Sequence, residues 1–242
     1  MQFRNKYLLG ISLLVCSVGS VFAGSCQFEL DTYSRGFKET CINNKILAIT
    51  DNFGRVKAAV HRVTGVRNYN DTYRPAQIQA YTGRIGRAGK DANSVFVPIL
   101  NPMSVVSAPE QISTLQLNEV MVSLPYTFID QGNIFEQLND FEFDSTAKRP
   151  NVESYTGVIY KNNRPSLIHK TLFDVQGRSI ISFLLPVEPT ASFAIAEHII
   201  ATRCIEEIGN FSFKNIPEEI KQTKAFDLHT WSVGGFEESC EV

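Results

Sequence analysis

The stretch that most constrains the fold covers residues 153–209, in which three strand-like runs are followed by one amphipathic run. The strand-like runs are 153–160, 166–174 and 180–185, and they are rich in β-branched and aromatic residues. Such residues fit a pleated, half-buried surface. Short turns with Asn or Gly separate the runs, so each run is expected to pair with the next in an antiparallel sheet.

The second run has two different faces. Alternation along a strand places His169 on one face and Lys170 on the other. One face is therefore mixed in character, as in an antiparallel sheet with one side toward solvent. Asn162 and Asn163 precede this run, and both tolerate the positive φ that a tight turn requires.

Residues 190–208 predict one helix, because their apolar residues recur at a spacing of four. Gly209 follows at the place where a left-handed C-terminal cap favours glycine. The stripe consists of Ala196, Ile200, Cys204 and Ile208. We therefore predict an α+β fold, an antiparallel sheet or sheets with this helix packed on one face.

Residues 1–23 have the pattern of a signal peptide: a basic start, a short apolar core and a small-residue cleavage site ending at Ala23. The apolar run is too short for a membrane span, so no transmembrane segment is expected after cleavage. We predict a secreted or periplasmic protein that begins at Gly24.

The mature chain then contains four cysteines, an even number that favours disulfides in an oxidising compartment. We favour the pairs Cys26–Cys41 and Cys204–Cys240, because each closes a modest loop near one end of the chain. The alternative joins Cys26 to Cys240 and Cys41 to Cys204, and would bring the two ends together.

The mature length fits one core or two small ones. A polar segment near residues 105–112 is the best place for a boundary, giving a β-rich N-terminal subdomain, 24–108, and an α+β C-terminal subdomain, 109–242. Positive charge is concentrated between residues 55 and 90, which hold eight Lys or Arg and one acid. This basic segment either faces the acidic C-terminal region or binds an anionic partner.

The Arg- and Tyr-rich loop 67–90 is the predicted contact surface, since interfaces favour these two residue types. Its GxxG tetrapeptide, 83–86, is too short a match to indicate a nucleic-acid domain, and the segment lacks the Walker spacing of a phosphate loop. The predicted partner-binding residues are Arg67, Tyr69, Tyr73, Arg74, Tyr81, Arg84 and Arg87.

No catalytic or metal pattern is found in the sequence. It has no HExxH, CxxC or GxSxG, and the histidines are widely scattered. Glu142 and Asp144, two residues apart, would share one face of a strand and resemble the paired acids of glycoside cleavage. An amphipathic edge strand is the simpler interpretation of the same pattern.

These observations favour a secreted or periplasmic, disulfide-stabilised binding or assembly protein without catalysis. It would contact a protein or an anionic surface ligand through loop 67–90, with no nucleic acid, cofactor or metal. The alternative is a secreted enzyme or toxin, hydrolase-like, whose site is assembled from distant acidic and His residues of the sheet. Glu142, Asp144 and His169 would be the first candidates for that site.

Overall fold

The structure of the chain is a computed structural model. It describes residues 26–30, 32–33, 36–64, 94–105, 117–129, 134–187, 194–225, 228–231, 233–236 and 240. The predicted signal peptide, 1–23, and the predicted contact loop, 67–90, lie outside the described residues.

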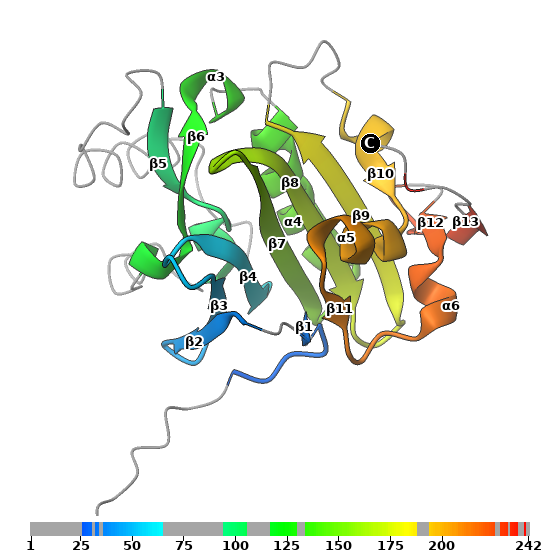
Figure 1. The fold of residues 1–242 in the computed structure, drawn as a ribbon. Coiled ribbons are helices and arrows are strands. Elements are labelled where there is room, and N and C mark those ends of the chain that lie inside the picture. The colour runs from blue at the N-terminus through cyan, green and yellow to red at the C-terminus, as the bar shows by residue number, and fades with distance from the viewer. Residues whose placement is uncertain are drawn as a thin grey trace, which may run out of the picture.

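Seven strands form one antiparallel sheet, in the order β10-β9-β8-β7-β4-β3-β2 (Figure 1). The predicted runs of 153–185 become its three longest strands, and the prediction of a largely antiparallel α+β fold is confirmed at this level. The strands are β2 (Lys38–Ile42), β3 (Ile46–Thr50), β4 (Val56–Arg62), β7 (Val152–Lys161), β8 (Arg164–Asp174), β9 (Ser179–Pro186) and β10 (Ile199–Ile200).

Asparagines shape the hairpin turns of this sheet. Asn162 and Asn163, between β7 and β8, have φ values of 53° and 63°, as the sequence predicted. Asn43 and Asn44, between β2 and β3, have φ values of 51° and 55°. Asparagine adopts this left-handed conformation more readily than other non-glycine residues. The two turns fix the registers of the strands that they join.

Helix α4 (Ile134–Lys148) covers one face of the sheet, behind β7 and β8 in Figure 1. Phe135, Leu138 and Phe141 recur at a spacing of three and belong to the main apolar cluster on this face. The prediction of an edge strand or paired acids at Glu142 and Asp144 is therefore wrong. The helical periodicity of the preceding residues continues through them and buries Glu142, whereas Asp144 is exposed.

Helix α5 (Thr202–Gly209) packs on the opposite face of the sheet, over β9 (Figure 1). Cys204 and Ile205 are fully buried there, in a cluster with Leu184 of β9 and Leu167 of β8. Both faces of the sheet are thus covered, so the expectation that one side faces solvent is wrong. Lys170 and His169 on β8 point to opposite faces and are both buried.

The helix predicted over 190–208 is shorter than expected. Within its described part, residues 195–198 form a 3-10 turn, η3 (Ile195–His198), and Ile199 and Ile200 form β10. These two isoleucines pair with Phe183 and Ser182 at the edge of β9. β-branched residues favour such pairing over the interior of a helix. The α-helix therefore begins at Thr202.

The end of α5 differs from the prediction in its capping residue. Asn210 adopts the left-handed conformation, with φ 55° and ψ 48°, and Gly209 is the last helical residue. Gly209 is required for another reason, because a Cβ there would overlap the ring of Phe211. The glycine lets that ring fold back over the end of the helix.

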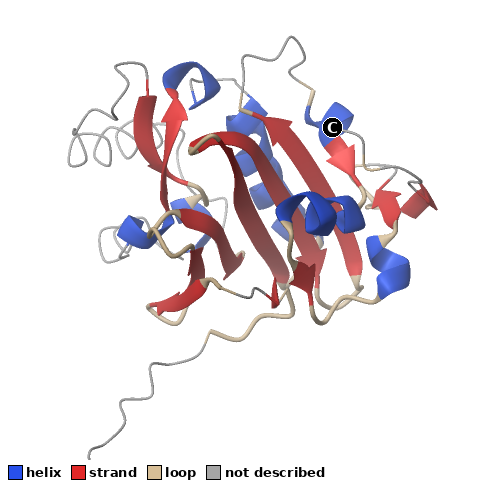
Figure 2. Cartoon of the chain, viewed as in Figure 1, coloured by secondary structure: helices blue, strands red, loops and turns tan. Residues whose placement is uncertain are grey.

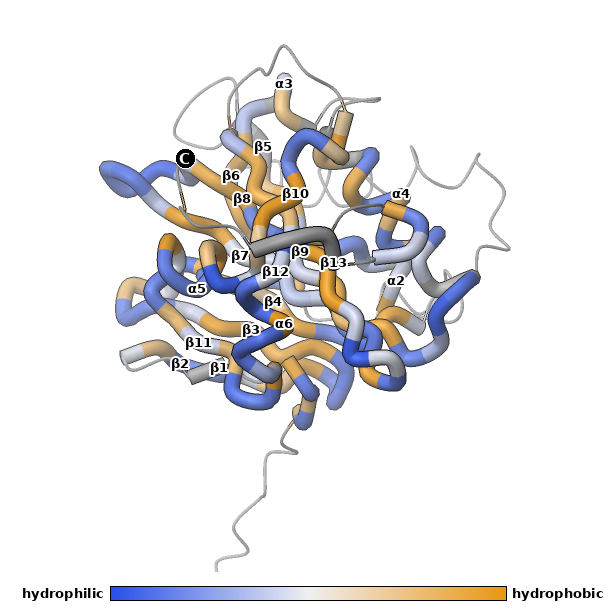
Figure 3. Tube along the Cα trace, turned by 90° about the vertical axis from the view of Figure 1, so that its right-hand side faces the viewer, coloured by the Kyte–Doolittle hydropathy of each residue, from blue (hydrophilic) through white to orange (hydrophobic). Residues whose placement is uncertain are grey.

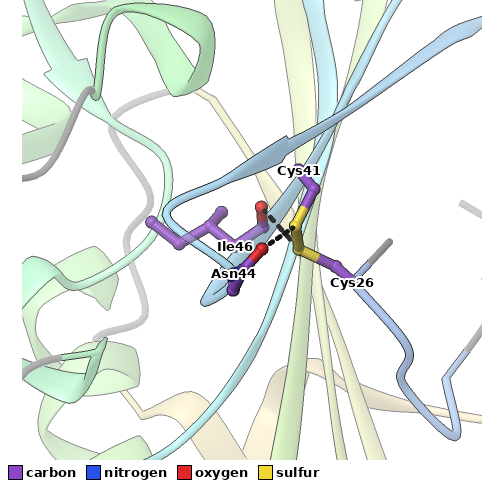
Figure 4. The surroundings of a disulfide bond; sticks show 4 residues. All are labelled: Cys26, Cys41, Asn44 and Ile46. Carbon is purple, nitrogen blue, oxygen red and sulfur yellow. Dashed lines mark hydrogen bonds between the residues drawn. A yellow bond between two sulfur atoms is a disulfide. The ribbon is translucent and has the colours of Figure 1, made fainter. Parts of the chain in front are cut away.

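Two disulfides join Cys26 to Cys41 and Cys204 to Cys240, which is the pairing favoured from the sequence. The first attaches the N-terminal segment to β2, where Cys26 Sγ lies 3.3 Å from the carbonyl oxygen of Ile46 (Figure 4). Nearby, the backbone N–H of Leu30 donates to the buried carboxylate of Glu153 at 3.0 Å. The N-terminal segment is thus held at two places.

The other described elements are small (Figure 2). No helix among the described residues is long and apolar enough to cross a membrane. Three two-stranded sheets pair β1 (Thr32–Tyr33) with β11 (Ser212–Phe213), β5 (Ser94–Pro98) with β6 (Met121–Pro125), and β12 (Thr223–Ala225) with β13 (Val233–Phe236). The short helices are α2 (Pro102–Val105), α3 (Tyr126–Ile129), α6 (Glu218–Lys221) and the 3-10 helix η2 (Leu117–Val120).

Hydropathy follows this architecture. Apolar residues run along the strands and hydrophilic residues gather in the connecting turns (Figure 3). The seven-stranded sheet takes β2, β3 and β4 from one side of the predicted domain boundary and β7 to β10 from the other. The pairing of β4 with β7 joins these two parts of the chain in one sheet.

Candidate functional sites

A polar cluster is buried between the sheet and α4. Its centre is the carboxylate of Glu142, and five elements each contribute one side chain. They are His61 of β4, Ser104 of α2, Glu142 of α4, Ser154 of β7 and Lys170 of β8. All five side chains are buried, so the cluster links the elements around it.

Each oxygen of the Glu142 carboxylate has its own partners. Oε1 lies 2.9 Å from Nε2 of His61, and Oε2 accepts from Ser154 Oγ at 3.0 Å and from the ammonium of Lys170. The Ser104 hydroxyl donates to the carbonyl oxygen of Asn101 at 2.7 Å, and its Oγ lies 2.8 Å from Nε2 of His61. We therefore place the His61 proton on Nε2, shared between Glu142 and Ser104.

The polar neighbours in this cluster hold Glu142 ionised. Burial alone raises the pKa of a carboxyl group, but the charge of Lys170 and the electrostatic interactions and hydrogen bonds that Lys170 and His61 make with Glu142 outweigh burial here. The pKa of Glu142 is consequently well below its usual range. A carboxylate that stays ionised and has no solvent access is suited to fixing the positions of its neighbours.

An aromatic pocket lies on the opposite face of the sheet, the face that carries α5. Its volume is about 160 Å³. Its aromatic and polar walls are Phe37, Lys57, Tyr155, Tyr160, His169 and Phe211, and aliphatic side chains of β3, β7 and α5 complete it. The pocket is separated from the Glu142 cluster by the thickness of the sheet, because Lys170 and His169 alternate along β8.

His169 is at the centre of the aromatic stack in this pocket. Its ring stacks on Tyr155 and on Phe211, with centroid distances of 5.5 Å in both cases. Burial lowers the pKa of His169 to about 3, so the imidazole is neutral at physiological pH. Its Nδ1 is buried and has no hydrogen-bond partner among the described residues.

Gly157, which pairs with His169 across β7 and β8, makes room for the imidazole. A Cβ at this position would overlap the Nε2–Cε1 edge of the ring. Any residue other than glycine would therefore displace His169. The ring edge consequently lies directly above the backbone of β7.

Basic side chains surround Tyr160 at the same pocket. The Lys57 ammonium lies 4.8 Å from the centroid of the Tyr160 ring, and the Arg55 guanidinium lies 5.1 Å from it. Arg55 also forms an ion pair with Asp51 at 2.8 Å and donates to Asn163 at 2.6 Å, so it joins two hairpin turns. Burial is the main cause that lowers the pKa of Lys57.

The residues singled out from the sequence have separate locations. Glu142 and His169 lie on opposite faces of the sheet, and Asp144 is exposed on α4, so these three do not form one site. No group of His, Cys, Asp or Glu suited to a metal ion occurs among the described residues. The seven predicted partner-binding residues, Arg67, Tyr69, Tyr73, Arg74, Tyr81, Arg84 and Arg87, lie outside the described residues.

Sequence inspection missed the Glu142 cluster and the aromatic pocket. Ser104, Ser154 and Lys170 have no distinguishing local pattern, and they meet only through long-range strand pairing. One signal for the pocket is present in the sequence: His169 and Gly157 both occur in runs predicted to pair, and a glycine within a strand often marks a close approach.

The fold resembles a solved structure. A chain from the crystal structure of the EndoG/EndoGI complex, which addresses the mechanism of EndoG inhibition, superposes with a TM-score of 0.55 and 13% sequence identity. The match covers 83% of this chain and 92% of that chain. No protein-family profile matches this sequence, and no curated protein is similar to it. At this identity the likeness concerns the fold alone.

This finding overturns the function predicted from the sequence. The sequence predicted a binding or assembly protein organised around loop 67–90. The likeness does not support this prediction, because it extends over most of the fold and the matched chain comes from a complex of EndoG with EndoGI. The first candidates for the alternative, a hydrolase-like site in the sheet, do not form one site. Its acids lie on a helix, and its histidine is on the far side of the sheet from Glu142.

Proposed function

We propose that this chain is one component of an inhibition complex, in which it binds a protein partner as the two proteins of the EndoG/EndoGI complex bind one another. The observation that carries this proposal is the shared fold, which extends over 83% of this chain and 92% of the matched chain. The proposal is an analogy at the level of the fold, because one fold can serve unrelated functions.

The buried framework supports a role that requires a preformed surface. The Glu142 cluster fixes five elements relative to one another, and two disulfides attach the N-terminal segment and residue 240 to the same body. A protein that is already rigid loses less conformational entropy when it binds a partner. Such rigidity favours tight complexes of the kind that inhibition requires.

We infer that the protein works in an oxidising compartment. The two disulfides of the structure fit this setting, since such bonds persist in secreted and periplasmic proteins. A signal peptide that is cleaved after Ala23 would direct the chain there. An intact mass of the protein from its native host tests this step, and a chain that retains residues 1–23 would contradict it.

Two further predictions from the sequence stay open. One is the division into subdomains 24–108 and 109–242, and the other is a partner contact made by the seven Arg and Tyr residues of 67–87. Limited proteolysis of the oxidised protein tests the division, because two stable fragments would support it and a single resistant core would oppose it.

The proposal is tested by mixing the purified, oxidised protein with EndoG and, separately, with EndoGI. Size-exclusion chromatography with light scattering measures the mass of each mixture, and EndoG activity is assayed in parallel. We expect a stoichiometric complex with one of the two proteins. Binding to EndoG with loss of its activity assigns this chain the inhibitor's role, whereas binding to EndoGI assigns it the inhibited role.

Two controls make the result interpretable. The same chain reduced and unfolded should bind neither protein, because the proposed surface depends on the fold. Folding of the oxidised sample is verified by a cooperative thermal transition before mixing. A folded sample that forms no complex with either EndoG or EndoGI overturns the proposal.

A further inference from the structure

We propose that the aromatic pocket beside His169 binds a small planar aryl carboxylate. This inference does not rest on the proposed inhibition complex, because it concerns a small-molecule pocket and not a protein interface. Three properties of the pocket carry it: its size, its aromatic walls, and the Lys57 ammonium at its wall.

The size of the pocket selects small ligands. Its volume of about 160 Å³ matches one six-membered ring with a small substituent. An apolar cavity of about 150 Å³ is known to accept benzene. A nucleotide or a disaccharide is several times larger than this volume. The pocket therefore fits a single ring.

The residues that line the pocket favour a ligand with a flat, apolar ring. Tyr155, Phe211 and Tyr160 present rings to the pocket, and Phe37 adds a fourth. Tyr155 and Phe211 lie 5.2 Å apart between centroids, and both stack against His169. Aromatic groups gain affinity from offset or edge-to-face packing beyond the area that they bury. An aromatic ring consequently fits these walls better than a saturated ring.

The stack is held in place before any ligand arrives. Gly157 and Gly209 lack side chains at the two positions where a Cβ would overlap His169 and Phe211. The rings therefore rest directly on the backbone of β7 and on the last turn of α5. A preorganised site of this kind costs little conformational entropy on binding.

Lys57 supplies a cation to the pocket. Its ammonium contacts the Tyr160 ring, and it has no ion pair among the described residues. Arg55, the neighbouring cation, is by contrast engaged by Asp51 and Asn163. A partly buried ammonium without a counter-ion favours an anionic group beside it. The ligand is therefore expected to carry a negative charge.

His169 contributes an aromatic wall and not a charge. Its Nε2–Cε1 edge lies against the backbone of Gly157, which is not among the residues that line the pocket. Lys57 is therefore the group that distinguishes ligands by charge. A carboxylate is attracted to its ammonium, whereas a ligand amine is repelled by it.

The test uses benzoate as the probe, with benzylamine and cyclohexanecarboxylate as matched controls for charge and planarity. Binding to the oxidised protein is measured by isothermal titration calorimetry and by ligand-observed NMR. We expect benzoate to bind at least tenfold more tightly than either control. Equal binding of all three probes, or no binding of benzoate at millimolar concentration, overturns the inference.

Two variants locate the binding site. Lys57→Met should weaken benzoate binding about tenfold or more, the effect of losing one charged hydrogen bond. Lys45→Met, at an exposed lysine in the turn between β2 and β3, should leave it unchanged. Equal affinities in Lys57→Met and Lys45→Met, both verified as folded, would place benzoate elsewhere.

Discussion

Lys170 and Glu142 form an ion pair in which both side chains are completely buried, one on the inner strand β8 and the other on helix α4. The carboxylate also accepts from Ser154, and the ammonium also donates to Asn139 at 3.2 Å. A buried pair of this kind is sensitive to the loss of one partner, because the remaining charge stays in a poorly solvating environment.

We therefore predict that Lys170→Met lowers the free energy of unfolding by about 3–5 kcal/mol, as breaking a buried pair does in general. The double variant Lys170→Met with Glu142→Leu should recover part of this loss, since no charge is then left without a partner at that position. Urea denaturation of both variants measures the difference. Lys161→Met, an exposed lysine at the end of β7, is the matched control and should change stability by less than about 0.5 kcal/mol.

The same cluster predicts that the free energy of unfolding depends on pH in the acidic range. The pKa of Glu142 is lower in the folded than in the unfolded chain, so the folded state binds fewer protons at low pH. The stability that Glu142 contributes is complete above pH 4.5, the ordinary pKa of a glutamate side chain, and declines as the pH falls below that value. Denaturation between pH 6 and pH 3 should show this decline in the native protein. It should be smaller in the Glu142→Leu, Lys170→Met double variant, and equal slopes would contradict the assignment.

His169 titrates in a different range. Its pKa is about 3 in the folded protein and 6.5 in the unfolded chain, so the folded state again binds fewer protons. Stability from this group is complete above pH 6.5 and is lost as the pH falls toward 3. The expected loss between pH 6.5 and pH 5 is about 1.6 kcal/mol, because the slope reaches its full value of about 1.4 kcal/mol per pH unit only well below pH 6.5. His169→Phe should remove most of this slope, and thermal unfolding at the two pH values measures it.

Local patterns in the sequence predicted the strands and turns of 152–186 well, because each depends on neighbouring residues. Asn162 and Asn163 adopt the conformation that a tight hairpin requires, and alternation correctly separated His169 from Lys170. The disulfide pairs were also predictable, since short loops restrict which cysteines meet. These features follow from backbone preferences and chain geometry.

Tertiary contacts decided the features that were predicted wrongly. Ile199 and Ile200 fit a helical stripe as well as a strand, and only the free edge of β9 selects the strand. Glu142 alternates with Phe141 and Phe143 as a strand residue would, yet the partners that bury its charge come from β4, β7 and β8. Local patterns cannot contain this information because the partners are distant in sequence.

Gly157 and His169 form a pair that only glycine permits. Gly157→Ala places a Cβ in the imidazole edge, so the ring must shift into a packed aromatic stack. We expect a loss of about 1–3 kcal/mol in the free energy of unfolding. His169→Ala in the same chain removes the overlap, so the second substitution should cost less in the Gly157→Ala background than in the native one. A double-mutant cycle by urea denaturation measures this coupling, and strict additivity would show that the two residues do not interfere.

The two disulfides should differ in their contribution to stability. Cys204–Cys240 spans 36 residues and attaches residue 240 to α5, whereas Cys26–Cys41 spans 15 residues. Under the chain-entropy account, the longer loop restricts the unfolded chain more, by about 0.8 kcal/mol between these two lengths. We predict that Cys204→Ala with Cys240→Ala lowers the free energy of unfolding by more than Cys26→Ala with Cys41→Ala, each by about 2–5 kcal/mol. Denaturation under non-reducing conditions compares the two variants directly. The reverse order would indicate that contacts of the N-terminal segment, such as that of Leu30 with Glu153, depend on the first disulfide more strongly than loop entropy implies.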